Sequence, residues 1–239
     1  MTLRSGRRSG PARSVRNRSR RGVVGTDSWP ASEILGWQAT ATAMHDARIE
    51  AVIARLLDGG AETVLDLGCG AGLLLRRLIS EPHIRRLVGV DSSPGALLLA
   101  QQLLVSGDGS IDPRLELRQA SVIDVHPDLG DLDAAVMVET IEHLDPAHLC
   151  RLERSLFAGL RPRIVVITTP NREYNTLLGL RPDELRHPDH RFEWERRRFE
   201  GWSSGVARRN GYSVEFDGVG PANAWFGSST QMAVFHSRS

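Results

Sequence analysis

The sequence predicts an α/β domain: a mostly parallel, seven-stranded sheet with helices on both faces. Short apolar segments of strand length alternate with segments whose apolar residues recur at helical spacing. This alternation is typical of parallel strands that are joined by helices and covered by them on both faces. A glycine-rich turn follows the first apolar segment, and 41% hydrophobic with 25% charged residues is the composition of a globular domain.

The expected elements follow one another in a regular order. A helix is predicted over residues 42–58, because Ile49, Val52 and Leu56 recur at helical spacing and Gly59 can end the helix. Strands are expected at residues 63–68, 86–91, 114–120, 132–138, 163–170, 212–219 and 230–237. Further helices are expected at residues 71–80, 94–106, 146–160 and 196–212.

The charge distribution predicts one domain over residues 31–239, preceded by a disordered tail at residues 1–30. All 30 basic residues of the chain are Arg, and eight of them lie in residues 1–21, which contain no acidic residue. A segment with so few apolar residues cannot offset the entropy of ordering it. Two interpretations stay open: an electrostatic arm for phosphate backbones, or a solvated leader.

Composition also argues against several classes of protein. No run of 18 apolar residues occurs, so no membrane span is expected, and the basic N-terminus lacks the apolar core of a secretory signal. Two cysteines, Cys69 and Cys150, do not make a disulfide framework. We therefore expect a cytoplasmic protein without membrane contacts.

A glycine-rich segment, DLGCGAG at residues 66–72, follows the first predicted strand and opens a helix. Glycines allow a tight turn and a close approach of the backbone to a ligand. A dinucleotide fingerprint would require glycine where Leu73 stands, so phosphate binding is disfavoured. Asp91 ends the second strand, where an acid can accept hydrogen bonds from ribose hydroxyls. A glycine turn without a ligand is the structural alternative.

Three residues able to bind a metal follow the fourth predicted strand. Glu139, Glu142 and His143 would share one face if this segment formed the first turn of a helix. Such a set can converge on a cation. Acidic residues at the start of a helix also stabilise its dipole without any catalytic role, so the spacing alone leaves both interpretations open.

Together, the glycine loop and Asp91 resemble the class I S-adenosylmethionine-dependent methyltransferases, whose fold is Rossmann-like. The resemblance covers about residues 60–170 and implies S-adenosylmethionine as the cofactor, but it does not identify the substrate. It implies cofactor contacts from Asp66, Gly68, Cys69, Gly70, Asp91, Ser92, Ser121 and Val122.

Two downstream segments narrow the resemblance. With ETIEHL, the segments TPNREYN (residues 169–175) and RHPDHRFEWERRRF (residues 186–199) are similar to the bacterial small-RNA 3′-terminal 2′-O-methyltransferases. This resemblance implies methylation of the 2′-hydroxyl at an RNA 3′ end with a free 2′,3′-diol, for RNA protection or repair. It implies a metal-binding insertion around residues 170–195. It also implies that Mn²⁺ or Mg²⁺ binds Glu139, Glu142, His143 and His190. Of these, Glu142, His143 and His190 are the expected catalytic residues.

The chain departs from the family pattern in two places. Glu195 follows the FEW triplet where the family usually has Thr, and the run GPANAWFGSS at residues 220–229 is unusual. Both departures affect the expected contacts with the RNA end. His187 is a possible competitor for His190, and we interpret it as lying behind the ligands or in solvent. His45, His126 and His148 are expected on the surface.

Candidate RNA contacts are Arg172, Arg186, Arg191 and the run at residues 196–198. A separate RNA-repair protein is a candidate partner, and a monomer is favoured. One alternative function is that of a metal-free O-methyltransferase acting on a small molecule, which ETIEHL alone would permit and against which the segment DHRFEW argues. Another is that of an RNA-binding module without catalysis, against which the intact cofactor loop counts.

Overall fold

A computed structural model describes residues 31–124 and 129–238, with side chains from residue 43 onward. The expected tail at residues 1–30 and His126 lie outside the described residues. The chain divides into two units, Met1–Thr40 and Ala41–Ser239. The elements are α1 (Ala31–Asp58), β1 (Thr63–Leu67), α2 (Leu73–Ile79), β2 (Arg86–Asp91), α3 (Pro94–Leu104), β3 (Leu115–Gln119), β4 (Ala134–Val138), η3 (Ile141–His143), η4 (Pro146–His148), α4 (Leu149–Glu153), η5 (Arg154–Leu160), β5 (Ile164–Pro170), η6 (Arg172–Leu178), α5 (Arg196–Asn210), β6 (Tyr212–Asn223) and β7 (Gly227–Ser237).

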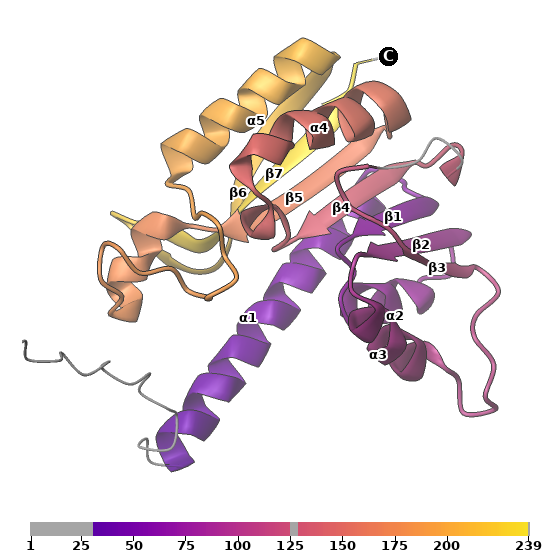
Figure 1. Cartoon of the computed structure of the whole chain (residues 1–239), viewed down its shortest axis with the longest axis horizontal. Coiled ribbons are helices and arrows are strands. Elements are labelled where there is room, and N and C mark those ends of the chain that lie inside the picture. The colour runs from indigo at the N-terminus through magenta and orange to yellow at the C-terminus, as the bar shows by residue number, and fades with distance from the viewer. Residues whose placement is uncertain (1–30, 125–128, 239) are drawn as a thin grey trace, which may run out of the picture. The chain divides into compact units, whose positions relative to one another are not determined.

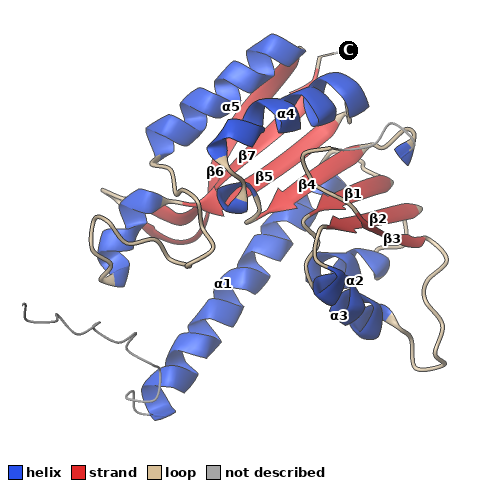
Figure 2. Cartoon of the chain, viewed as in Figure 1, coloured by secondary structure: helices blue, strands red, loops and turns tan. Residues whose placement is uncertain are grey.

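The second unit contains one seven-stranded sheet in the order β3-β2-β1-β4-β5-β7-β6 (Figure 1). Strands β1 to β5 pair in parallel, whereas β7 runs antiparallel to both β5 and β6. Figure 2 shows the strands as one twisted sheet with helices against it. The predicted mostly parallel α/β fold is confirmed.

Helices cover both faces of this sheet because successive strand residues point in opposite directions. On β1, Leu65 packs with α4, η5 and α5 on one face, while Val64 packs with α2, α3 and the described side chains of α1 on the other. Both side chains are fully buried. Each contributes about 2 kcal/mol through the removal of apolar surface from water, so the continuous apolar strands build two cores at once.

The turn between β1 and α2 needs glycine for two different reasons. Gly68 has φ +81°, and a Cβ there would lie 2.5 Å from the Thr140 side chain. Gly70 has φ +53°, with no atom within 4 Å of such a Cβ. Conformation restricts both positions and close packing restricts Gly68 as well, so the loop passes tightly over the start of the segment that follows β4.

Four predicted elements differ in extent or form from their expectation. Helix α1 begins at Ala31 rather than near residue 42, because the apolar residues from which it was predicted, Ile49 to Leu57, all lie in its second half. The single helix expected at residues 146–160 consists of successive 3-10, α and π turns; apolar spacing alone does not distinguish these hydrogen-bonding patterns. Strands β6 and β7 extend through most of the unusual run at residues 220–229, as a hairpin.

Within the ranges that the structure describes, no helix combines the length and apolar character needed to cross a membrane.

Candidate active site

A cavity of about 250 Å³ lies beside the glycine-rich loop, at the carboxyl ends of β1 and β4. This edge is where parallel α/β sheets commonly bind ligands. The lining residues are His45, Ile49, Asp66, Gly68, Cys69, Gly70, Ala71, Leu73, Leu74, Val138 and Glu139. Four predicted cofactor residues, Asp66, Gly68, Cys69 and Gly70, are thus brought together in one cavity.

Asp91, at the end of the neighbouring strand β2, fixes the glycine-rich loop by hydrogen bonds. Its two carboxylate oxygens accept hydrogen bonds from the backbone amides of Gly70 and Ser93, both at 2.9 Å. Ser92 lies between them and is exposed. The carboxylate that was expected near a ribose therefore fixes the two loops that end β1 and β2.

The predicted adenine-side residues, Ser121 and Val122, follow β3. Ser121 is exposed and lines a separate small cavity of about 10 Å³ together with Val90 at the end of β2. Val122 is buried in the core. The two residues therefore lie in different surroundings, and only Ser121 faces open space.

Two ionisable groups at the glycine-loop side of the larger cavity, Asp66 and Cys69, have raised pKa values. Burial, followed by repulsion from Asp91, raises the pKa of Asp66 to about 7. Burial and the nearby Asp66 carboxylate raise the pKa of the Cys69 thiol. Cys69 is therefore a neutral thiol near neutral pH, while Asp66 changes its charge there.

The acidic segment after β4 does not form the expected helical turn. Glu139 has φ 51°, a rare conformation for a residue other than glycine, and only Ile141–His143 forms a short 3-10 helix. The amide of Glu139 still bonds the Thr168 carbonyl on β5 at 3.2 Å, so pairing with β5 competes with helix formation. The arrangement considered for Glu139, Glu142 and His143, one shared face of a helical first turn, is therefore not formed, and strain of this kind is common at functional sites.

Both carboxylates in this segment are partly unsatisfied. Glu139 pairs with Arg48 of α1 at 3.1 Å, and Glu142 accepts a hydrogen bond from Thr169 at 2.9 Å. The other oxygen of each carboxylate, Oε1, is buried and has no hydrogen-bond partner among the described residues. Burial raises both pKa values, and repulsion from Glu139 raises that of Glu142 further. A cation would relieve both penalties.

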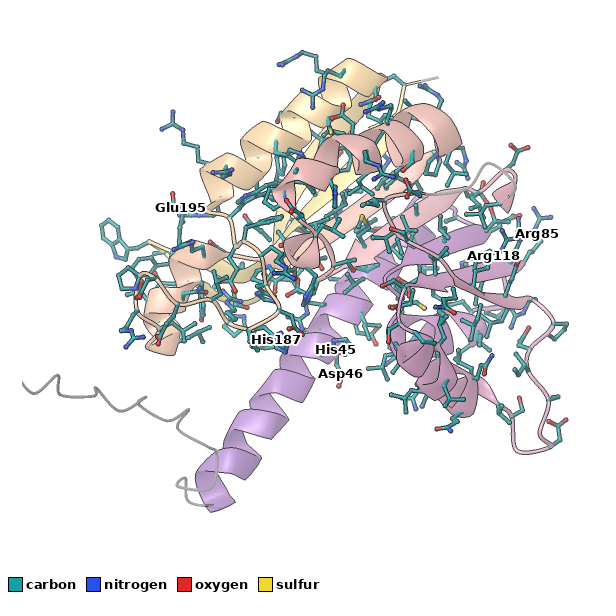
Figure 3. All side chains as sticks on the ribbon, in the orientation of Figure 1. His45, Asp46, Arg85, Arg118, His187 and Glu195 are labelled. Carbon is teal, nitrogen blue, oxygen red and sulfur yellow. The ribbon has the colours of Figure 1, made fainter. Side chains whose placement is uncertain are left out.

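Three histidines meet beside this segment. Potential ligand atoms of His143, His187 and His190 lie within 4.8 Å of one another. This group does not include Glu139 or Glu142, although His190 is near enough to influence the pKa of Glu139. Figure 3 labels His187, which comes from the loop that follows η6. The structure therefore brings two predicted ligands, His143 and His190, together with the expected competitor.

The loop that carries His190 is fixed from two sides. Nδ1 of His190 lies 2.6 Å from Oε1 of Glu193, and the amide of Arg191 donates to the Glu142 carbonyl at 2.7 Å. Glu193 is buried and also accepts from Asn175 and from the amide of Arg186. With Nδ1 engaged, Nε2 of His190 is the ring nitrogen left for a ligand.

Arg186, an expected RNA contact, uses its guanidinium for hydrogen bonds within the protein. Its guanidinium donates to Asn175 at 2.6 Å, to the Ser229 carbonyl at 2.9 Å and to the Asn171 carbonyl at 2.5 Å. These bonds tie the loop to β7 and to η6. Of the other candidate RNA contacts, Arg191, Arg197 and Arg198 are exposed, whereas Arg172 and Arg196 are half-buried.

Sequence reasoning missed two residues of α1. His45, expected on the surface, lines the larger cavity and has a buried Nε2, so that expectation was wrong. Arg48, one turn further along, forms the ion pair with Glu139. His45 and Arg48 are three residues apart, so the predicted helix already placed them on one face. The sequence of that helix does not indicate what this face contacts.

The strand order, the glycine-rich loop and the acid at the end of β2 define a class I methyltransferase domain. A family model described as a methyltransferase domain matches residues 64–163. The crystal structure of the methyltransferase domain of bacterial CtHen1 is 38% identical, with a TM-score of 0.72, and covers 81% of this chain and 99% of its own. The chain belongs to the small RNA 2′-O-methyltransferase family.

Two curated relatives support this assignment. The small RNA 2′-O-methyltransferase of Rattus norvegicus is 40% identical over 181 residues, which are 72% of this chain and 45% of the relative. The protein of the same name from Arabidopsis thaliana is 31% identical over 206 residues, 79% of this chain and 22% of the relative. The chain thus spans less than half the length of either protein.

Proposed function

We propose that this protein transfers a methyl group from S-adenosylmethionine to the 2′-hydroxyl of the 3′-terminal nucleotide of RNA, with the help of a divalent cation. The observation that carries the proposal is the pair of buried carboxylates, Glu139 and Glu142, each with an unpaired oxygen, beside the cavity and the histidines. The names of the relatives support RNA as the substrate, and the loop and cavity support S-adenosylmethionine as the methyl donor.

The residues fit a divalent cation. The ligands would be Glu139, Glu142, His143 and His190, with His187 as a further candidate from the same cluster. Carboxylate oxygens with imidazole nitrogens suit Mn²⁺ or Mg²⁺ better than a structural zinc site, which favours thiolates. A bound cation would lower the pKa of a coordinated ribose hydroxyl and so favour its attack on a methyl group.

The protein's own groups orient the reactants. The loop of Gly68 and Gly70, held by Asp91, would fix the methyl donor, and Glu193 holds the imidazole of His190. Confinement of donor and acceptor at one edge of the sheet supplies much of the acceleration, because it converts a bimolecular step into an effectively unimolecular one. Arg48 neutralises part of the charge on Glu139, which keeps two adjacent carboxylates tolerable before a cation binds.

The proposal includes selectivity for the RNA terminus. A terminal ribose offers adjacent 2′ and 3′ hydroxyls, whereas an internal nucleotide has no free 3′ hydroxyl. The exposed Arg191 and the half-buried Arg172 would contact phosphates without regard to sequence. A cytoplasmic location, a separate RNA-repair partner and a monomeric state belong to the same proposal.

The test is methyl transfer from radiolabelled S-adenosylmethionine to four otherwise identical RNAs. Their ends carry a 2′,3′-diol, a 2′-deoxy, a 3′-deoxy or a 3′-phosphate group, and each is assayed with Mn²⁺ or with EDTA. We expect transfer only to the diol and only with the metal. Transfer that persists in EDTA would contradict the metal-dependent part, and transfer only to small hydroxylated molecules would overturn the RNA assignment.

A further inference from the structure

The described part of α1 contributes a polar group to the cavity beside the glycine loop. His45 and Ile49, one turn apart, line this cavity together with Asp66 and the loop residues that follow β1. Figure 3 labels His45 on α1. The wall that α1 supplies therefore has an apolar side chain and an imidazole, and neither belongs to the motif that follows β1.

The imidazole of His45 is incompletely satisfied. Its Nε2 is buried, and none of the described residues offers it a hydrogen bond. A polar atom in that state is unfavourable unless something else pairs with it. Because the same side chain lines a cavity large enough for part of a ligand, a ligand atom is the natural partner.

The charge state of His45 defines the kind of atom it can pair with. Burial, and next the positive charge of Arg48, lower its pKa, while Asp46 acts weakly in the opposite sense. The ring is therefore neutral near pH 7, with one nitrogen as a donor and the other as an acceptor. A neutral N–H that reaches a buried cavity is a suitable donor to a carboxylate.

A second lining residue of this cavity, Asp66, supplies the complementary group. Asp66 is buried at the end of β1, lines the same cavity and accepts rather than donates when it is ionised. A donor on α1 and an acceptor on β1 match the two charged groups of an α-amino acid. Its ammonium group would pair with Asp66, and its carboxylate with His45.

We propose that His45 is a cofactor-binding residue whose Nε2–H donates a hydrogen bond to the α-carboxylate of S-adenosylmethionine, with Asp66 taking the α-ammonium group. This inference rests on the proposed function only in assuming that S-adenosylmethionine occupies the cavity. It gives α1 a part in ligand recognition that the glycine loop alone does not account for.

The test compares two ligands that differ by one group. Calorimetry measures the Kd of S-adenosylmethionine and of decarboxylated S-adenosylmethionine for the wild type and for His45→Leu. We expect the leucine variant to bind S-adenosylmethionine about tenfold or more weakly, the range for a hydrogen bond to a charged group. Its affinity for the decarboxylated ligand should stay within about threefold of the wild-type value.

Two further variants make the comparison specific. His45→Gln keeps an N–H donor and should bind S-adenosylmethionine more tightly than His45→Leu does. His83→Leu alters an exposed histidine away from the cavity and should change neither affinity. All variants are checked for cooperative thermal unfolding, and His45→Phe, which also lacks an N–H donor, replaces the leucine variant if that one does not fold.

Several results would overturn the inference: unchanged affinity for S-adenosylmethionine in the leucine variant, equal losses for both ligands, or lost methyl transfer with intact cofactor binding. The readout does not depend on RNA. A protein that binds the cofactor in this carboxylate-dependent way but fails to methylate RNA would contradict the proposed function and support this inference.

Discussion

The glycine-loop cavity and the acid–histidine site lie at the same edge of the sheet but are built differently. The loop at Gly70 is held by Asp91, a group that follows it closely in the chain and has both carboxylate oxygens hydrogen-bonded. The second site joins Glu142 to His190 across a long separation in sequence, through backbone bonds from the 186–195 loop. Its carboxylates keep unpaired, buried oxygens.

This difference in hydrogen bonding indicates different requirements for a ligand at the two sites. A loop whose polar groups are satisfied within the protein is rigid before a ligand arrives, which lowers the entropic cost of binding. A site with buried, unpaired carboxylates is unfavourable by itself and is stabilised by what it binds. The glycine loop is therefore organised by the fold, whereas the carboxylates of the second site need an added charge to be satisfied.

The largest expected effect comes from Glu142. We expect Glu142→Gln to reduce methyl transfer to RNA by on the order of a thousandfold, because a neutral amide cannot stabilise a cation as a buried carboxylate does. The Kd of S-adenosylhomocysteine should change by less than about threefold, since Glu142 does not line the cavity. Kinetics with saturating RNA measure the loss of methyl transfer, and calorimetry measures the Kd of S-adenosylhomocysteine.

The matched control is Glu215→Gln, an exposed glutamate on β6. It removes the same charge from the protein and should leave methyl transfer unchanged. Equal losses of cofactor affinity and turnover in Glu142→Gln would mean that Glu142 also serves cofactor binding. The two sites could then not be treated as separate.

Sequence reasoning predicted the first site more completely than the second. The loop at residues 66–72 and its acid are local patterns on strands that apolar spacing reveals. It also identified His143 and His190, which the structure brings together with ring centroids 4.8 Å apart. That pairing depended on a family resemblance, because no spacing rule joins residues from two distant segments.

The features that the sequence did not predict are tertiary contacts between distant segments. Glu139 leaves the expected helix because its amide pairs with β5, an interaction that depends on strand order. The side chains of His45 and Arg48 reach the site from α1, whose sequence reads only as an amphipathic helix. Arg186 looked like an RNA contact, yet its three hydrogen bonds hold the loop together.

A smaller effect is expected behind His190. Glu193→Gln should reduce methyl transfer by roughly ten- to a hundredfold, because groups that orient a metal-binding imidazole typically matter by that much. The neutral amide weakens the 2.6 Å contact with Nδ1 of His190. The loss should appear as a higher Mn²⁺ concentration for half-maximal activity, while cofactor affinity is unchanged.

Glu195→Gln is the matched control, two residues further along. Figure 3 labels Glu195 just before α5; it is exposed, and its side chain makes no capping hydrogen bond. We expect its metal dependence to equal that of the wild type. A similar shift in both variants would mean that the charge of the loop, rather than the orientation of His190, controls metal binding.

The smallest effect concerns pH and the first site. Burial raises the pKa of Asp66 to about 7, so the free protein holds a proton there at mildly acid pH. An ammonium group prefers the ionised carboxylate, so binding must release that proton, and affinity should rise with pH. Between pH 5.5 and 7, where an α-amino group stays protonated, the affinity for S-adenosylhomocysteine should increase about tenfold.

His45 acts in the opposite direction, because its lowered pKa makes it gain a proton, and attraction for a carboxylate, only at acid pH. The difference between the wild type and Asp66→Asn therefore isolates Asp66. The asparagine variant should show no increase in affinity with pH. Parallel pH profiles for the two proteins would mean that Asp66 does not pair with the ammonium group. The glycine-loop cavity would then lack a charged contact from β1, and its ligand would be held by the loop backbone and α1 alone.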